Sequence, residues 1–372
     1  MTKEEYRAAM DDVIYLASCM VNEAVPDAGR AAEMNLDRLY AAADRHMLTG
    51  IIGYALESAG IRHDAFYRER MRAVRNAVLF DAERKAVLDK LEEAGIWYMP
   101  LKGIVLKELY PKIGMRQMAD NDILYDVSRC DDLRVIMESL GFEAKTHVMN
   151  DYDHDCFEKL PIFNFEMHRA LIHPGPGKAI FKYYRNAKDR LIKDDGNAFG
   201  YHFSDEDFYT YMVTHEYKHF DNGGTGLRSV LDTYIYCTRK GGQLDWKYIE
   251  RELKKLGLYD FERANRSLAL HLFGGEELTD DEKEMLEYII FSGTYGTQKN
   301  YVQNGLRKKG RVGFLISRTF LPYSAMVSAY PILHKLPFLL PVFWVVRIVS
   351  ALFSKPKKVM YQLLSSFRKI EK

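Results

Sequence analysis

The stretch that decides the fold covers residues 96–126, IWYMPLKGIVLKELYPKIGMRQMADNDILYD. Its first five residues, 96–100, form an aromatic and apolar run typical of a short buried strand. A helical segment follows over 105–110, and after a loop a second strand is predicted over 120–126. Strand, helix and strand in so short a distance predict a unit built around a sheet.

The flanking sequence continues this alternation. Helical spacing over 81–94 ends at a glycine, as helices commonly do. After the second strand we expect a helix over 128–140, capped by Ser128, and further strands over 142–148 and 163–169. The predicted class is therefore α+β, with a small mixed sheet.

The rest of the chain is patterned mainly as helix. Apolar residues recur at helical spacing over 4–79 and again from residue 205 onward. We therefore predict four regions: an N-terminal helical region (1–80), a sheet-containing core (81–200), a helical domain (201–300) and a basic, apolar-rich C-terminal helical segment (301–372).

Composition limits the class of protein. Of the 372 residues, 47% are hydrophobic and 28% are charged, which excludes a chain disordered throughout. The four cysteines lie far apart without a Cys-x-x-Cys pair, so we expect neither a disulfide framework nor a thiolate zinc site. The acidic N-terminus lacks the features of a signal peptide. Together these points predict a cytoplasmic protein.

Charge is distributed unevenly along the chain. Residues 301–372 hold 13 Lys and Arg against one acidic residue, although the whole chain carries a net charge of only +1. Such a segment predicts an anionic partner, and the alternative is a solvated basic face that balances an acidic body.

Within this segment, residues 336–353 form an apolar stretch flanked by lysines. Two prolines and the central Arg347 disfavour a membrane span, because an arginine at mid-helix costs about 2.5 to 3.5 kcal/mol on insertion. The stretch is predicted either to lie on an anionic membrane surface or to pack as a helical lid on the body.

Two carboxylates at the second strand indicate a cation site. Asp120 and Asp122 are two residues apart, so on a strand both leave the same face. Glu166, on the strand over 163–169, is the candidate third ligand, and His168 shares its face. Such oxygen ligands suit Mg²⁺ or Mn²⁺ held together with substrate phosphates. The alternative is a structural role, because paired acids at a strand end are common.

Lys102 and Gly103 join the first strand to its helix. Glycine lets backbone N–H groups approach a phosphate, a helix N-terminus favours anions, and Lys102 adds a positive charge. The pair predicts a phosphate-binding turn, with an ordinary strand-to-helix turn as the alternative.

These features follow one another in a fixed order. The order is Leu101-Lys102-Gly103, Tyr110-Pro111, Gly114-x-Arg116, Asp120-x-Asp122-Ile-Leu, Leu140-Gly141-Phe142 and Glu166-x-His168. This series resembles the DNA polymerase β-like nucleotidyltransferase superfamily, and especially a bacterial family of uncharacterised nucleotidyltransferases. The resemblance is closest over 95–170 and weaker to about residue 350. Lys102-Gly103 departs from the superfamily's usual Gly-Ser or Gly-Gly, and Asn121 stands where an apolar residue is usual.

The resemblance implies an activity. It implies a small mixed sheet flanked by helices, with metal ligation by Asp120, Asp122 and Glu166. The implied reaction moves a nucleoside monophosphate from a triphosphate such as ATP to a hydroxyl, with release of pyrophosphate. The acceptor, whether a small molecule, a glycan precursor or a protein, cannot be read from the sequence. Strong nucleic-acid binding is not expected, because the catalytic half is acidic and lacks an aromatic-basic strip.

Further residues are assigned to the nucleotide and the acceptor. The predicted nucleotide contacts are Lys102, Gly103, Arg116 and His168. Arg116 is expected to pair with triphosphate oxygens through its planar fork, or else to form a surface ion pair. The candidates for the acceptor or the cleft are His154, Asp155, Lys159, His215, His219, Arg228 and Asp232.

A second motif competes with this hypothesis. Residues 215–219, His-Glu-Tyr-Lys-His, match the zinc-peptidase signature in which two helical histidines bind zinc and glutamate acts as base. The longer metzincin pattern is missing, and Asp232 is the candidate third ligand. Arg228 and Asp232 can instead pair on one helix face, and His215 and His219 can face the nucleotide cleft or pack on the sheet. A zinc peptidase and a catalytically weak, membrane-peripheral nucleotide-binding protein are therefore the alternative hypotheses.

Overall fold

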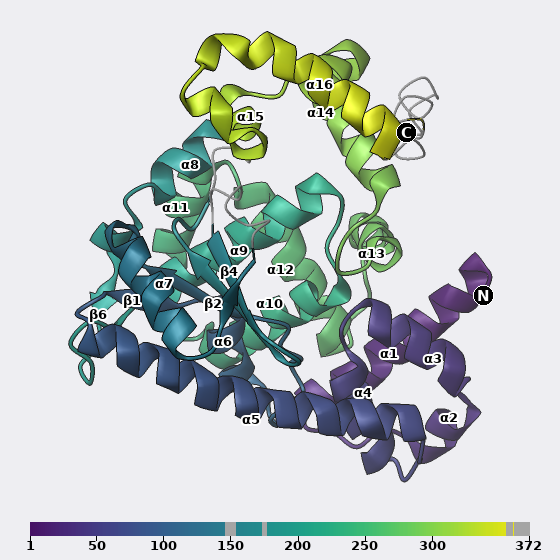
Figure 1. Cartoon of the computed structure of the whole chain (residues 1–372). Helices are drawn as coiled ribbons and strands as arrows, with labels where there is room; N and C mark the ends of the chain where they lie inside the picture. The colour runs from purple at the N-terminus through teal and green to yellow at the C-terminus, as the bar shows by residue number, and fades with distance from the viewer. Residues whose placement is uncertain (146–153, 173–176, 355–359, 361–372) are drawn as a thin grey trace.

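The computed structural model describes residues 1–145, 154–172, 177–354 and 360, and it begins with a helical bundle. The bundle comprises α1 (Lys3–Val21), α2 (Ala28–Glu33), α3 (Leu36–Arg45), α4 (Thr49–Ser58) and α5 (Asp64–Glu93). Thr2 and Glu5 form a reciprocal capping box that starts α1, whose apolar face packs on α3 and α4. Helix α5 runs on through residue 80 and connects the bundle to the sheet (Figure 1). The division of the chain into four regions stays a prediction.

Five strands form one mixed sheet in the order β1-β2-β5-β4-β3. They are β1 (Tyr98–Pro100), β2 (Asn121–Tyr125), β3 (Glu143–Ala144), β4 (His154–Lys159) and β5 (Phe163–His168). β2 and β5 pair in parallel, whereas the other neighbours pair antiparallel. This sheet confirms the predicted α+β class, and the strands predicted over 96–100, 120–126 and 163–169 correspond to β1, β2 and β5.

The two faces of the sheet are buried against different helices, because successive side chains of a strand point to opposite sides. Ile123 and Phe165 pack with α5 and α7 (Cys130–Ser139). On the other face, Leu124 packs with Met212 of α9 (Asp205–Asn222). Asp122 lies two residues before Leu124 and therefore faces α9.

Strand β4 occupies a segment for which the sequence pattern predicts no strand. Phe157 is its one fully buried residue, so no apolar alternation marks it as a strand. It forms because its backbone pairs with β5 over its whole length, from His154 opposite His168 to Lys159 opposite Phe163. Tertiary pairing therefore overrides weak local preference here.

Two boundaries around α7 also differ from expectation. Asp126, and not Ser128, caps the short turn before the helix, and its carboxylate accepts a hydrogen bond from the backbone N–H of Ser128. The strand predicted over 142–148 is present at 143–144 as β3, and residues 146–148 lie outside the described ranges.

The second half of the chain is mainly helical, as predicted. It contains α8 (Lys178–Tyr184), α9, α10 (Leu227–Lys240), α11 (Trp246–Leu256), α12 (Tyr259–Gly274) and α13 (Asp280–Ser292), with a small ribbon of β6 (Ile192–Lys193) and β7 (Tyr201–His202). A turn over residues 223–226 joins α9 to α10. Short 3-10 helices lie along the chain at Lys107–Leu109, Val127–Arg129, Ala187–Arg190, Pro331–His334 and Pro337–Leu339.

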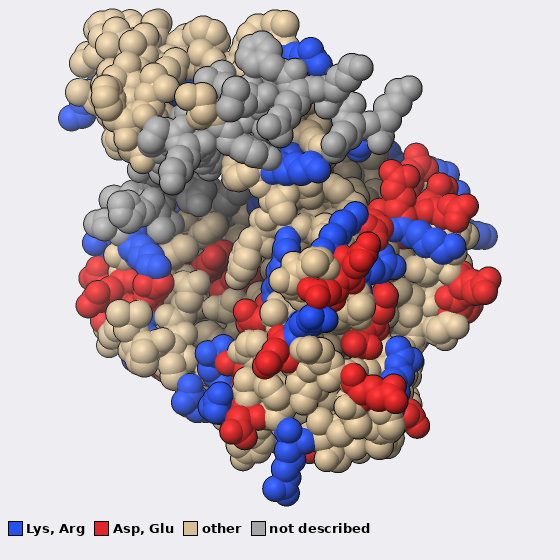
Figure 2. Space-filling view, turned by 90° about the vertical axis from the view of Figure 1, so that its right-hand side faces the viewer, with Lys and Arg blue, Asp and Glu red and all other residues tan. Residues whose placement is uncertain are grey.

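The C-terminal segment projects from the body. It comprises α14 (Gln298–Thr319), which kinks at Gly310 where φ is 65°, α15 (Tyr323–Ala329) and α16 (Leu340–Ser354). Figure 1 shows α15 and α16 at the top of the molecule with α14 running down towards the body, and Figure 2 shows a projection at the upper left with few charged residues. The stretch Pro337–Ser354 is long and apolar enough to cross a membrane by length and composition, and none of it is buried.

Candidate active site

Three carboxylates meet at the beginning of β2 and the middle of β5. Parallel pairing places Asp122 directly opposite Glu166, at the ordinary spacing of neighbouring strands. Asp120 precedes β2, and one carboxylate oxygen from each of the three residues lies within 4.8 Å of the others. Residues from two distant parts of the sequence thus form one acidic cluster.

Two imidazoles border this cluster. His168 lies at the end of β5, and its Nε2 is 3.0 Å from Oδ1 of Asp122. His154 stands opposite His168 across the antiparallel β4–β5 pair, and its Nε2 is 3.6 Å from Oε2 of Glu166. The pairing of β4 with β5 therefore places His154 beside the carboxylates.

Proximity changes the acidity of the carboxyl groups. Burial and the negative charge of Asp122 raise the pKa of Asp120 to about 6. Burial, Asp122 and Asp120 raise the pKa of Glu166 to about 7. Burial opposes ionisation of Asp122 as well, but the hydrogen bond and charge of His168 outweigh it, so the pKa of Asp122 lies below its ordinary value. The cluster thus carries more negative charge than its protein surroundings neutralise.

The cationic side of the site begins with Lys102. This residue starts the five-residue helix α6 (Lys102–Leu106) with φ of 26°, and its Nζ lies 2.8 Å from Nδ1 of His215 on α9. Because α6 has only five residues, its helix dipole is weak, and the positive charge of this turn resides on the side chain of Lys102. Gly103 gives room for Arg116, since a Cβ at this position would lie 3.0 Å from Nη1 of Arg116.

Replacing Lys102 by Met is expected to raise the free energy of unfolding by about 3 kcal/mol at pH 7. Burial, together with Arg116 and Arg228, lowers the pKa of Lys102 from 10.5 to about 8. Below pH 8 both folded and unfolded states hold the proton, so the cost of the buried charge is complete. Between pH 8 and 10.5 the unfolded chain binds more protons, so wild-type stability rises with pH and the gap to the variant closes.

Urea denaturation at pH 7 and at pH 10 measures this gap. Lys85→Met, which removes an exposed lysine from α5, serves as control and should change stability little. Equal stability of wild type and Lys102→Met at pH 7 would contradict the prediction.

Arg116 is held by Asp232 in a buried ion pair. Its Nε and Nη2 donate to the two carboxylate oxygens of Asp232 at 2.8 and 2.9 Å, and the hydroxyl of Tyr110 donates to the same carboxylate at 2.8 Å. The ion pair of Arg116 is therefore buried, and the surface ion pair considered as the alternative is wrong. The pairing of Arg228 with Asp232 that the sequence suggested does not form. Arg228 donates instead to the carbonyl oxygen of Gln117 at 3.1 Å.

Two of the candidate acceptor residues lie away from the cluster. Asp155 pairs with Arg169 and accepts a hydrogen bond from Tyr125, and Lys159 pairs with Glu83 at 2.6 Å. The reason is strand alternation, because residues 155 and 159 of β4 point to the face opposite His154. We therefore correct their assignment to the cleft.

The two histidines of the zinc-peptidase motif, His215 and His219, are neighbours on α9 with ring centroids 4.6 Å apart and line the cleft, but the glutamate of the motif does not. That glutamate, Glu216, is buried and accepts hydrogen bonds from Asn265 and Thr233, at 2.8 and 3.4 Å. The ammonium of Lys102 lies against His215, where it repels a cation, and Asp232 is engaged with Arg116. Among the described residues, the metal-ligating groups found do not include His215 or His219. This geometry disfavours zinc at the motif.

The clustered side chains line one cleft with a volume of about 340 Å³, a size suited to part of a small ligand. The residues of its wall that the sequence analysis predicted as site residues are Lys102, Gly103, Arg116, Asp120, Asp122, His154, Glu166, His168, His215, His219 and Arg228. Others carried no local signal: Met47, Gln117, Ala119, Leu171, Lys218, Thr225, Ser229, Thr294 and Tyr295. Helices far apart in sequence bring these residues together, so only the fold identifies them.

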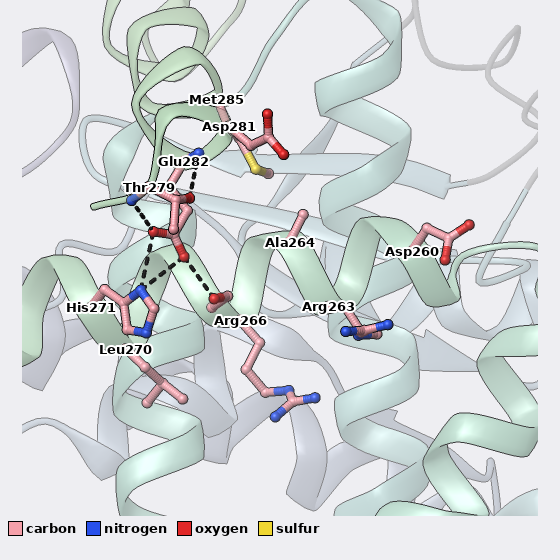
Figure 3. A pocket seen from close by; sticks show the side chains of 11 residues that line it. Asp260, Arg263, Ala264, Arg266, Leu270, His271, Thr279, Asp281, Glu282 and Met285 are labelled. Carbon is pink, nitrogen blue, oxygen red and sulfur yellow. Dashed lines mark hydrogen bonds and ion pairs between the residues drawn. The ribbon is translucent and has the colours of Figure 1, made fainter. Parts of the chain in front are cut away.

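A second hollow, of about 580 Å³, lies between α12 and α13 (Figure 3). Its central carboxylate is Glu282, which belongs to the capping box of α13 and also binds Ser267 and His271. Because these groups satisfy one another within the protein, we assign this hollow a structural role.

Comparison with known proteins places the acidic cleft in context. The model of a family described as uncharacterised nucleotidyltransferase matches residues 32–274. The match covers the sheet, the acidic cluster and α9 to α12. No curated protein and no solved structure matches the chain.

Proposed function

The chain belongs to the uncharacterised nucleotidyltransferase family, and from this premise we propose that it transfers a nucleoside monophosphate to a hydroxyl of an acceptor. The observation that carries the proposal is the convergence of Asp120, Asp122 and Glu166 within 4.8 Å, in a cleft that the cationic Lys102 and Arg228 also line. Such a cleft suits a nucleoside triphosphate with its divalent cation.

The donor set fits a divalent cation. Three carboxylates offer the hard oxygen ligands that Mg²⁺ and Mn²⁺ accept. Their mutual repulsion, which raises the pKa of Asp120 to about 6 and that of Glu166 to about 7 after the effect of burial, is relieved when a cation lies among them. Bound there, a divalent cation would activate the acceptor hydroxyl and offset charge on the phosphates.

The residues of the chain then divide the work. Lys102 and Arg228 pair with the triphosphate oxygens. The acceptor oxygen forms a bond to the α-phosphorus, the bond from that phosphorus to the bridging oxygen breaks, and pyrophosphate leaves with the electron pair. The hydroxyl, which a bound cation would make more acidic, gives its proton to water as the new bond to phosphorus forms.

The test is incubation with each α-labelled triphosphate, Mg²⁺ or Mn²⁺, and fractionated cell extract. Transfer of label to one fraction with equimolar pyrophosphate release supports the proposal and identifies donor and acceptor. Triphosphate binding without transfer would favour the alternative of a catalytically weak nucleotide-binding protein. Stoichiometric zinc in purified protein, lost in His215→Ala, would favour the peptidase.

The C-terminal segment supports a second proposal, peripheral contact with an anionic membrane at the cytoplasmic face. Helix α16 has no buried residue, and Phe338, Val345 and Phe353 are 72%, 60% and 84% exposed. Residues 301–354 include seven Lys and Arg and no acidic residue, so charge complements an anionic lipid surface. An exposed apolar face with a basic surround is typical of a membrane-surface helix.

Arg347 does not oppose this contact. Its guanidinium donates to the carbonyl oxygens of Arg318 and Thr319, so it satisfies the C-terminal end of α14. The indole N–H of Trp344 donates to the carbonyl of Leu321 at 2.9 Å. Both polar groups therefore point towards residues 318–321 at the end of α14, and the face of α16 directed away from these residues stays apolar.

Val345→Glu combined with Phe353→Glu is expected to lower binding to phosphatidylserine vesicles about 10-fold or more. Two apolar side chains that would enter the bilayer surface are replaced by anions that the lipid repels. Vesicle co-sedimentation measures the effect. Val135→Glu, which adds the same charge at an exposed position of α7, is the matched control.

Unchanged vesicle binding by the double variant would overturn the membrane proposal. If the wild-type protein sediments as a dimer and the double variant as a monomer, the apolar face instead binds a second copy of the chain.

A further inference from the structure

The pairing of β4 with β5 builds a second group of metal-ligating atoms beside the three carboxylates. His154 and His168 stand opposite each other on the two strands, and their ring centroids are 5.1 Å apart. Their Nε2 atoms lie 3.6 and 3.9 Å from the same oxygen, Oε2 of Glu166. One ligand atom from each of the three residues lies within 4.8 Å of the others.

These distances fit a common cation. Ligand atoms at about 2.1 Å from one cation lie roughly 3.0 to 4.2 Å from each other, depending on the angle between them. The two separations between histidine and glutamate, 3.6 and 3.9 Å, fall within that interval. All three residues also line the cleft, so an ion can reach them.

Glu166 belongs to both groups. It is the third carboxylate beside Asp120 and Asp122, and it is the carboxylate between His154 and His168. A shared carboxylate is the usual means of holding two cations about 3.5 to 4 Å apart. The geometry therefore provides two neighbouring positions of different chemistry, one with oxygen ligands throughout and one with two nitrogens.

We propose that Glu166 bridges two cation positions and that the second position, formed with His154 and His168, takes a first-row transition-metal dication such as Mn²⁺ in preference to Mg²⁺. The proposal rests on the proposed function, since it assigns the second metal of the same cleft. The chemical reason is ligand type: Mg²⁺ keeps oxygen ligands and sheds water reluctantly, whereas imidazole nitrogen suits transition-metal dications.

The alternative for these histidines is charge neutralisation alone. In that role His168 donates its hydrogen bond to Asp122, and His154 stays beside Glu166 without binding an ion. The two roles differ in one observable property, because only a bound ion acquires nitrogen atoms in its first coordination sphere.

The experiment uses chelator-treated full-length protein without a histidine tag and without nucleotide, titrated with Mn²⁺ and followed by electron paramagnetic resonance. Pulsed measurements should detect ¹⁴N coupling from imidazole on bound Mn²⁺. His154→Gln and His168→Gln should each weaken binding at this position at least about 10-fold and reduce the coupling. Excess Mg²⁺ should displace Mn²⁺ from the all-oxygen position while the nitrogen-coupled signal persists.

His202→Gln is the matched control, because His202 is exposed on β7 and pairs with Asp194 outside the cleft. Circular dichroism of each variant checks the fold. Bound Mn²⁺ without nitrogen coupling, or coupling unchanged in both His154→Gln and His168→Gln, overturns the proposal.

The result is separable from that for nucleotidyl transfer. Label transfer with Mg²⁺ together with absent nitrogen coupling would overturn only the second position. Nitrogen coupling without transfer of label from any triphosphate would count against the proposed reaction and support the second metal position.

Discussion

Asp122→Asn is expected to lower kcat/KM for nucleotidyl transfer at least about 1000-fold, the largest effect of any single change in this protein. Asp122 stands between the other two carboxylates and His168, and its pKa lies below the ordinary value because His168 donates a hydrogen bond to it and bears positive charge near it. The amide keeps the shape of the side chain and loses the negative charge, so cation binding fails while the fold is kept. Release of labelled pyrophosphate at saturating Mg²⁺ measures the loss.

The matched control is Asp131→Asn, which makes the same chemical change at an exposed position in the first turn of α7. It should leave kcat/KM within about 2-fold of wild type, and both variants should keep the wild-type melting temperature within a few degrees. Turnover in Asp122→Asn within 10-fold of wild type would remove the three-carboxylate cluster from the reaction.

Asp232→Ala is expected to reduce the free energy of unfolding by about 3 to 5 kcal/mol. The change leaves the guanidinium of Arg116 buried without its counter-charge and removes the acceptor for the hydroxyl of Tyr110. The side chains of Arg116 and Asp232 are only 4% and 5% exposed, so water cannot replace the lost carboxylate. Denaturant unfolding with a fitted slope measures the change.

The double variant Arg116→Met with Asp232→Leu separates a lost contact from an unpaired charge. Apolar replacement of both partners should recover most of the stability lost in Asp232→Ala, because no buried ion remains. A loss below about 1 kcal/mol in Asp232→Ala would show that solvent reaches Arg116 and that the pair is not sealed in the core.

Local sequence was sufficient for the framework of the sheet. The apolar run at 96–100 and the alternation at 163–169 predicted β1 and β5, because strands with a buried face carry their own periodicity. The same spacing rule placed Asp120 and Asp122 on one strand face. Strand β4 was beyond such reasoning, since Phe157 is its only fully buried residue and no alternation of apolar residues marks it, so that its pairing with β5 decides its conformation.

Partners separated by a long stretch of chain were likewise beyond local reasoning. Arg116 was expected to meet phosphate or solvent, and it meets Asp232, which is 116 positions away in the sequence. Arg228 has the right spacing to pair with Asp232 on α10, but the carboxylate is already occupied by a fork of two hydrogen bonds from Arg116. The stronger bidentate geometry prevails over helical proximity.

The sequence by itself determined the α+β class, the strands β1, β2 and β5, and the positions of Asp122 and Glu166 on strands with Asp120 directly before β2, because periodicity and spacing are properties of neighbouring residues. The tertiary structure alone decided which groups surround those acids. His154 reaches Glu166 only through antiparallel pairing, and Lys102 meets His215 only because α9 covers that face of the sheet. Contacts between distant segments depend on how elements pack, and no local pattern encodes that packing.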